Sequence, residues 1–227
     1  MQRVKIKILL VVLLGLFVPG YSQYIENDAA LWLNASVEKK LSDKIVVQLN
    51  QKNRIYNNFS HYGLGYADLG LYYKINKHIR LQGDYVFGLQ RNYKNESALP
   101  HQFYLAITFK QKINRFTFLY RNMVQMRYKS YFTSETGTIP KLYERNKFTV
   151  KYELNKKMTF YVSEEIRYPF DQSRNKGLNR SRSSLGLEYS FSKTIVVQPY
   201  FTFQQELNAF NKTNRDFIYG LGFSYEF

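Results

Sequence analysis

Any catalysis by this chain would have to use one of its three histidines or a pair of neighbouring carboxylates. A serine hydrolase needs a serine activated by a histidine, with a third group that orients the ring. His61, His78 and His101 are scattered, and no His-x-Ser pair occurs. Glu164 and Glu165 are adjacent, so in a strand they point to opposite faces. We therefore assign no catalytic residue. Three scattered histidines and no cysteine predict no metal site and no cofactor.

A larger group of charged residues lies at alternate positions of segments whose other positions are apolar. We assign this group to the interior of a barrel: Lys52, Arg54, Arg80, Asp84, Arg121, Arg127, Arg145, Lys147, Lys151, Glu165, Arg167, Arg180, Arg182, Glu188 and Glu206. Basic side chains outnumber acidic ones, and such a lining favours anions. The alternative is structural, since charges in a narrow interior have to pair with one another.

The alternation itself predicts β-strands. In 116–128, Phe116 and Phe118 share one parity, and Arg121 and Arg127 share the other. Alternation alone does not say which face lies inside. Eleven such segments can be counted: 29–41, 45–56, 62–74, 79–91, 101–111, 116–128, 143–154, 158–168, 180–191, 195–206 and 215–227.

Short turns and longer connections alternate between these segments. The short turns are polar residues between two apolar ones: Leu41–Ile45, Ile75–Ile79, Ile113–Phe116, Leu154–Met158 and Phe191–Ile195. The longer connections fall near 57–61, 92–100, 129–141, 169–179 and 208–214. This asymmetry is typical of bacterial membrane barrels, with short periplasmic turns and longer extracellular loops. A soluble β-sandwich has no reason to separate its connections in this way.

The N-terminus has the form of a signal peptide over residues 1–22. A basic start is followed by an apolar stretch at 8–18, and Gly20 and Ser22 precede a cut before Gln23. The apolar stretch is short for a transmembrane helix. An uncleaved N-terminal anchor is the alternative. We expect residues 23–227 to form a single domain.

The composition agrees with a membrane barrel. Aromatic residues make up 18% of the chain and the mean hydropathy is −0.44. Only alternate residues of a barrel face lipid, which keeps the average hydropathy low. The net charge of +16 is spread along the chain without a nucleic-acid motif, so nucleic acid is not an expected partner.

The C-terminal strand is apolar or aromatic at every second residue: Leu221, Phe223, Tyr225 and the terminal Phe227. This pattern resembles the signal by which outer-membrane barrels are recognised by the barrel-insertion machinery, through addition of a strand at an open edge. The resemblance implies that the insertion machinery and periplasmic chaperones are assembly partners.

The mature chain, over roughly residues 25–227, resembles an uncharacterised family of outer-membrane β-barrels, a domain of unknown function in Gram-negative bacteria. The resemblance rests on a Trp-containing strand, Leu31-Trp32-Leu33, that runs into a basic hairpin, Glu38-Lys39-Lys40-Leu41, and on Tyr-rich strands with polar short turns. It carries no catalytic signature.

The expected fold is thus all-β: a closed, antiparallel, up-and-down transmembrane barrel of about 12 strands, within a range of 10–12. Eleven is odd, whereas bacterial single-chain barrels nearly always have an even number of strands. We therefore expect a further short strand within 23–28. Ten strands, or an N-terminal segment threaded through the lumen, are alternatives.

The expected location is the outer membrane, among its lipids and lipopolysaccharide. The expected function is non-enzymatic: a narrow anion-favouring pore, a solute-binding barrel or a structural barrel of the envelope. Two other functions stay open, an outer-membrane lipid hydrolase of the phospholipase or lipid A deacylase type, and a secreted soluble barrel that binds a ligand.

Overall fold

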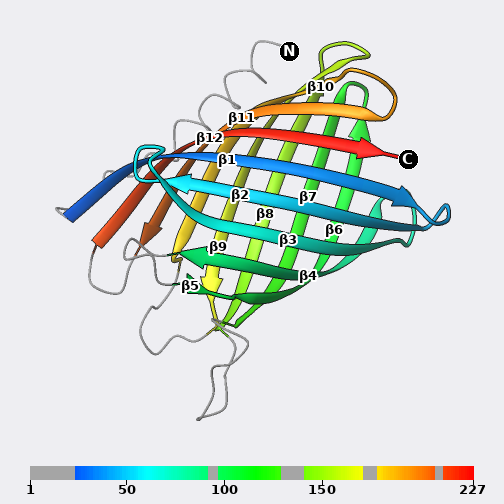
Figure 1. Cartoon of the computed structure of the whole chain (residues 1–227). Helices are drawn as coiled ribbons and strands as arrows, with labels where there is room; N and C mark the ends of the chain where they lie inside the picture. The colour runs from blue at the N-terminus through cyan, green and yellow to red at the C-terminus, as the bar shows by residue number, and fades with distance from the viewer. Residues whose placement is uncertain (1–23, 92–96, 129–140, 171–177, 208–211) are drawn as a thin grey trace.

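The computed structural model describes residues 24–91, 97–128, 141–170, 178–207 and 212–227, which form a closed β-barrel (Figure 1). The signal-peptide prediction and most of the long connections lie outside these residues. The strands are β1 (Tyr24–Lys40), β2 (Ile45–Tyr56), β3 (His61–Lys74), β4 (Ile79–Arg91), β5 (Ser97–Ala98), β6 (His101–Ile113), β7 (Phe116–Tyr128), β8 (Lys141–Glu153), β9 (Met158–Pro169), β10 (Arg180–Ser190), β11 (Ile195–Leu207) and β12 (Lys212–Glu226). No helix in this part of the chain is long and apolar enough to cross a membrane.

The barrel closes through a parallel pair of strands. Every other neighbouring pair is antiparallel, but β1 and β12 run in the same direction, from Tyr24 opposite Lys212 to Glu38 opposite Glu226. The backbone amide of Phe227 extends this seam by donating to the carbonyl oxygen of Glu38 at 3.0 Å. A parallel pair satisfies backbone groups on both strands, so an odd number of long strands still leaves no open edge.

The closed barrel and its eleven long strands are confirmed, but the further strand expected within 23–28 is wrong. Tyr24–Lys40 is one continuous strand of 17 residues. A closed barrel whose strands are all antiparallel needs an even number of strands, but one parallel pair allows an odd number. The twelfth strand of the sheet is β5, whose two residues pair with Gln90 and Arg91 of β4.

Four of the five short turns share one hydrogen-bonding scheme. The first polar residue, Ser42, Asn76, Asn155 or Ser192, accepts hydrogen bonds on its side-chain oxygen from backbone amides two and three residues later, at 2.8–3.3 Å. These are Asx and Ser/Thr turns. The fifth turn places Asn114 at a φ of 54°, a left-handed conformation that asparagine tolerates better than most residues. The short-turn motif seen in the sequence therefore specifies real turns.

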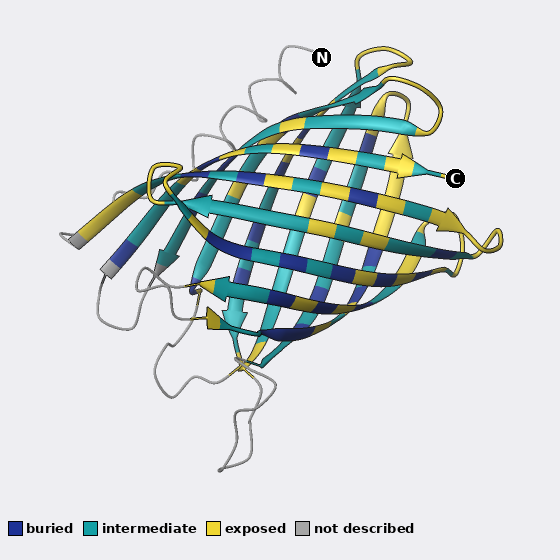
Figure 2. Cartoon of the chain, in the orientation of Figure 1, coloured by how far each residue is buried: buried dark blue, intermediate teal, exposed yellow. Residues whose placement is uncertain are grey.

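The apolar parity of each strand faces outward. Leu71, Leu105 and Phe148 are 54%, 61% and 49% exposed, whereas Gln102 and Gln125 on the other parity are buried inside the barrel. Figure 2 shows this alternation as bands of exposed and buried residues along the strands. A soluble barrel would bury the apolar parity; here the polar parity forms the interior.

Two tyrosine rings lie flat on the inner wall because each faces a glycine. Tyr200 is paired with Gly220 and Tyr161 with Gly186 on the neighbouring strand. A Cβ atom on Gly220 would lie 2.0 Å from the Tyr200 ring, and one on Gly186 would lie 2.6 Å from the Tyr161 ring. Without a glycine opposite, each ring would have to project into the lumen.

Gly220→Val should therefore destabilise the barrel by about 1–3 kcal/mol, because the new side chain collides with the Tyr200 ring. Gly222→Val is the matched control, since a Cβ on Gly222 would come no closer than 3.3 Å to any atom of Gln198, the residue opposite. Urea unfolding in lipid vesicles, followed by fluorescence of the single Trp32, measures both. Equal stability of Gly220→Val and wild type would contradict the packing argument, and Tyr200→Ala should restore part of the loss.

Candidate functional site

The inside of the barrel contains two cavities that meet at the same side chains. One, of about 740 Å³, lies toward the long connections and is lined by Asp28, Asn57 and His61 among others. The other, of about 380 Å³, lies deeper and is lined by Lys52, Asp68, Asp84 and Arg121 among others. Seven residues line both cavities and so lie at the boundary between them: Trp32, Arg54, Tyr56, Leu64, Gln90, Arg180 and Arg182. We call this boundary the passage.

A single carboxylate holds together three arginines from three different strands. Glu165 on β9 forms ion pairs with Arg145 at 2.6 Å, Arg121 at 3.1 Å and Arg182 at 3.3 Å. The side chain of Glu165 is only 7% exposed. A buried carboxylate is tolerable when several charged hydrogen bonds satisfy it. Glu165 therefore fixes the β7–β10 side of the lumen.

Other ion pairs lie on either side of Glu165 along the barrel axis. Glu206 pairs with Arg180 at 2.7 Å and with Arg167 at 2.8 Å, nearer to the long connections. Lys151 pairs with Glu188 at 2.6 Å, nearer to the short turns. On the opposite wall, Lys52 pairs with Asp68 at 2.5 Å. These pairs support the structural interpretation for part of the charged group.

Arg54 differs from these paired residues. Its guanidinium carbon lies 4.0 Å from the centre of the Trp32 ring and 5.5 Å from that of Tyr66. Arg182 approaches the same Trp32 ring at 5.1 Å. Cation–π contacts of this kind position a guanidinium without neutralising it. Two positive charges therefore share one indole at the passage between the cavities.

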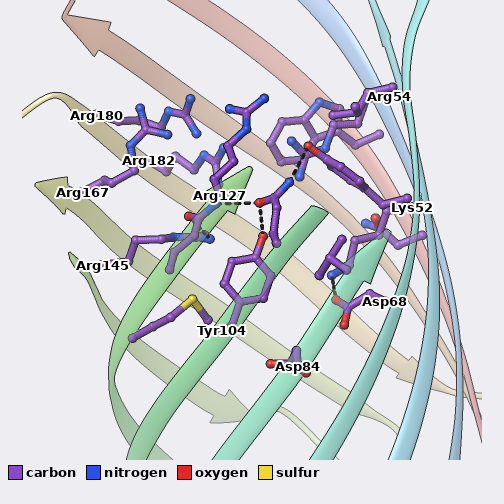
Figure 3. A pocket seen from close by; sticks show the side chains of 18 of the residues that line it. Lys52, Arg54, Asp68, Asp84, Tyr104, Arg127, Arg145, Arg167, Arg180 and Arg182 are labelled. Carbon is purple, nitrogen blue, oxygen red and sulfur yellow. Dashed lines mark hydrogen bonds and ion pairs between the residues drawn. The ribbon is translucent and has the colours of Figure 1, made fainter. Parts of the chain in front are cut away.

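Within the described residues, Arg54, Arg127 and Lys147 form no ion pair with a carboxylate. Arg127 donates to the side-chain oxygen of Gln90 at 3.0 Å, which leaves its charge uncompensated. Figure 3 shows Arg54, Arg127, Arg167, Arg180 and Arg182 around the same space, with Lys52 and Asp68 below. The deeper cavity is lined by eight basic and two acidic side chains, so its surface is predominantly cationic.

The structure places the predicted charged group as follows. Those lining the deeper cavity are Lys52, Arg54, Asp84, Arg121, Arg127, Arg145, Arg167, Arg180 and Arg182, and Glu206 lines the outer one. Glu165 joins them through its three ion pairs, whereas Glu188 and Lys151 pair with each other, nearer to the short turns. Lys147 lies opposite Glu165 in the β8–β9 register, and Arg80 lies 4.6 Å from the Tyr72 ring, nearer the short turns.

Sequence reasoning missed Asp68, which pairs with Lys52, and part of the uncharged lining. Trp32, Tyr104 and Gln102 line the deeper cavity, and Tyr104 donates to Gln102 at 2.6 Å. Trp32 has the same parity as the polar residues Asn34 and Ser36, and this parity is a local signal for an inward position.

The three histidines lie apart. His101 faces outward, where its Nδ1 lies 2.6 Å from the hydroxyl oxygen of Tyr85. His61 Nε2 lies 3.5 Å from the backbone oxygen of Arg91, near the long connections, and His78 Nδ1 lies 3.0 Å from that of Lys110, beside a short turn. The described residues contain no group of three metal-binding side chains.

The four residues of the predicted assembly signal also face outward. Leu221, Phe223, Tyr225 and Phe227 are 47%, 44%, 37% and 55% exposed. Tyr225 and Phe227 stack with ring centres 5.8 Å apart, and the Lys39 ammonium lies 5.1 Å from the Phe227 ring centre. These four residues thus form an apolar and aromatic stripe on the outer side of β12, beside the parallel seam.

Glu165→Gln should lower the free energy of unfolding by about 3–5 kcal/mol, because it leaves three buried arginines without their shared counter-charge. Glu188→Gln removes a carboxylate with one lysine partner in a more exposed position, and should cost about 1 kcal/mol or less. Urea unfolding of both variants in lipid vesicles tests this difference. Similar losses would mean that Glu165 is not the organising carboxylate.

Comparisons with known proteins identify a family. A search of solved structures finds the NanC porin, at 12% identity and a TM-score of 0.49, covering 87% of this chain and 95% of that one. It also finds the translocator domain of the autotransporter NalP from Neisseria meningitidis, at 11% identity and a TM-score of 0.42, covering 73% and 70%. No curated protein sequence matches. The profile of the family described as "Protein of unknown function (DUF2490)" matches residues 29–215. The chain therefore belongs to this family.

Proposed function

We propose that this protein resides in the outer membrane and that its lumen binds anions and lets them pass, as a narrow anion-favouring pore. In this proposal the 740 Å³ cavity is the outer vestibule, and the passage at Trp32, Arg54 and Arg182 is the selective constriction. The long connections face the outside of the cell and the short turns face the periplasm.

The outward face supports the location. Its strands carry large apolar and aromatic side chains such as Leu105, Phe148 and Tyr219 at 42% exposure or more. In water such a surface would aggregate, whereas in a bilayer it is the side that contacts lipid. Cleavage of residues 1–22 after export, and contact with lipopolysaccharide in the outer leaflet, belong to the same proposal.

The observation that carries the proposal is uncompensated positive charge in the lumen, from Arg54 at the passage and Arg127 in the deeper cavity. A lining that served only to fill the lumen would match each cation with a carboxylate, because an unpaired charge in the interior is costly. Glu165, Glu206 and Glu188 do this for their own partners. Arg54 and Arg127 have no such partner among the described residues, and a passing anion would supply the missing charge.

Removal of the Arg54 charge should weaken anion preference. In planar bilayers under a salt gradient, the wild-type barrel should show discrete conductance steps with a reversal potential that favours the anion. Arg54→Gln should lower the anion-to-cation permeability ratio by about twofold or more, since charged rings at a constriction set selectivity. Lys156→Gln, in an exposed short turn, removes the same charge outside the lumen and should leave the ratio unchanged.

Two outcomes would overturn this function. Stable insertion without conductance would exclude an open pore. Equal permeability ratios for wild type and Arg54→Gln would show that the passage does not select ions, even if the barrel conducts.

The C-terminal stripe gives a separate prediction about assembly. Phe227→Ala should reduce the amount of folded barrel in the outer-membrane fraction, because the insertion machinery would lose the terminal aromatic residue of the strand it pairs with. Phe116→Ala is a suitable control, as it removes another outward phenylalanine, 44% exposed, at the short-turn end of β7. The folded fraction is measured by its altered gel mobility before and after heating. Equal folded fractions for both variants would contradict the assigned role of Phe227.

A further inference from the structure

The outward face contains polar side chains where a lipid-facing wall should be apolar. Six outward residues on β7–β10 form what we call the outer polar patch: Tyr120, Asn122, Glu144, Asn146, Glu164 and Ser183. All six have the parity of outward apolar neighbours such as Phe148 and Val162. Their side chains hydrogen-bond to one another on the outside of the barrel.

Four of these residues form one connected hydrogen-bond network. Asn122 donates to Glu144 at 2.8 Å and to Asn146 at 2.9 Å. Tyr120 donates to the side-chain oxygen of Asn146 at 2.6 Å, and Asn146 donates to Glu144 at 3.2 Å. These contacts order the side chains into a fixed arrangement on the outer surface.

The other two residues extend the patch across the next strands. Glu164 on β9 accepts a hydrogen bond from the Ser183 hydroxyl at 2.5 Å. Glu164 pairs in register with Phe148, two residues from Asn146 on β8, so it is a diagonal neighbour of the network. The two parts therefore make one polar surface across four strands.

The patch lies within the apolar belt rather than at its rim. Asn122 is the middle residue of β7, with six residues on either side. Outward apolar residues flank the patch toward the short turns, namely Phe118, Phe148, Val150, Val162 and Leu185, and toward the long connections, namely Val124, Met126, Leu142 and Ile166. Lipid headgroups and water are therefore remote from its centre.

Lipid chains cannot satisfy this surface. Among the described residues, one carboxylate oxygen of Glu144 and one of Glu164 accept no side-chain hydrogen bond, and the Asn146 amide donates only once. Polar groups facing hydrocarbon are costly, and membrane proteins satisfy them by contact with another protein surface.

We infer that the outer polar patch is the contact surface between two copies of this chain in the membrane. Among the described residues, the second N–H of the Asn146 amide is an unused donor, and one carboxylate oxygen each of Glu144 and Glu164 is an unused acceptor. The Asn146 amide of one copy can therefore donate to a carboxylate of the other. Two barrels inserted in the same direction can be related by a twofold axis along the membrane normal. Each residue then lies at the same membrane depth in both copies, so the two patches face each other. The inference needs the barrel to lie in a bilayer, but it does not depend on what the lumen conducts.

The test uses disulfide cross-linking, because the chain contains no cysteine. Ile166→Cys places a reporter beside the patch, paired in register with Asn146. Leu69→Cys is the control reporter, an outward residue of β3 that is 53% exposed and far from β8 in the strand order. Each purified variant is refolded into lipid vesicles at a low protein-to-lipid ratio and oxidised, and folding is verified by heat-dependent gel mobility.

Ile166→Cys should give a disulfide-linked dimer in several-fold higher yield than Leu69→Cys. Adding Asn146→Leu to Ile166→Cys should reduce this yield several-fold, because it removes the amide at the centre of the patch. Adding Asn53→Leu instead should leave the yield unchanged. Asn53 is an outward amide on β2 that accepts from Tyr62 at 2.8 Å, so this control removes the same group from another wall.

Equal yields from the two reporters, or no dimer from a folded Ile166→Cys barrel, would overturn the inference. Oxidation in whole cells tests which protein contacts the outer polar patch. A cross-link from Ile166→Cys to a different protein, without the homodimer, would show that the patch binds another partner.

Discussion

The structure depends on one constraint: every backbone amide and carbonyl of the wall has to find a partner within the sheet, because hydrocarbon offers none. Ten antiparallel pairs of long strands satisfy most of these groups, and the parallel β1–β12 pair satisfies the rest. The C-terminal residue takes part, through the bond from Phe227 to Glu38. Closure in turn fixes which parity of each strand points inward, and so it determines the position of every charged side chain.

Inside the wall, the cations are held in two different ways. Glu165 and Glu206 each bind more than one arginine and connect neighbouring strands. Arg54, by contrast, is held by the Trp32 and Tyr66 rings. An aromatic ring positions a guanidinium and leaves its charge available. The paired cations thus account for the stability of the lumen, and Arg54 accounts for its proposed selectivity.

The outer wall divides in a similar way. Most outward residues are apolar and suit lipid, but Asn122, Glu144 and Asn146 bind one another on the lipid side. Glu164 and Glu165 illustrate the division within two residues. Glu164 accepts from Ser183 on the outside, and Glu165 pairs with three arginines inside. One strand therefore contributes to the proposed subunit contact and to the lumen.

The sequence by itself determined the strands, the turns and the two faces, because these are local properties. Period-two alternation located eleven long strands, and Ser42 or Asn76 at the start of a short turn provides the side-chain oxygen that the turn requires. The same parity identified the charged residues that line the cavities, from Arg54 to Glu206. Only the tertiary structure decided which of these charges pair, because partners such as Arg121 and Glu165 are 44 residues apart.

The closure of the barrel also required the tertiary structure. Whether Tyr24–Asp28 forms a separate strand or continues β1 depends on its pairing with β12, which no local pattern contains. The same holds for the contact of Arg54 with Trp32 and for the outer polar patch. In each case residues from different strands meet only after the sheet has closed, since strand register and curvature bring them together.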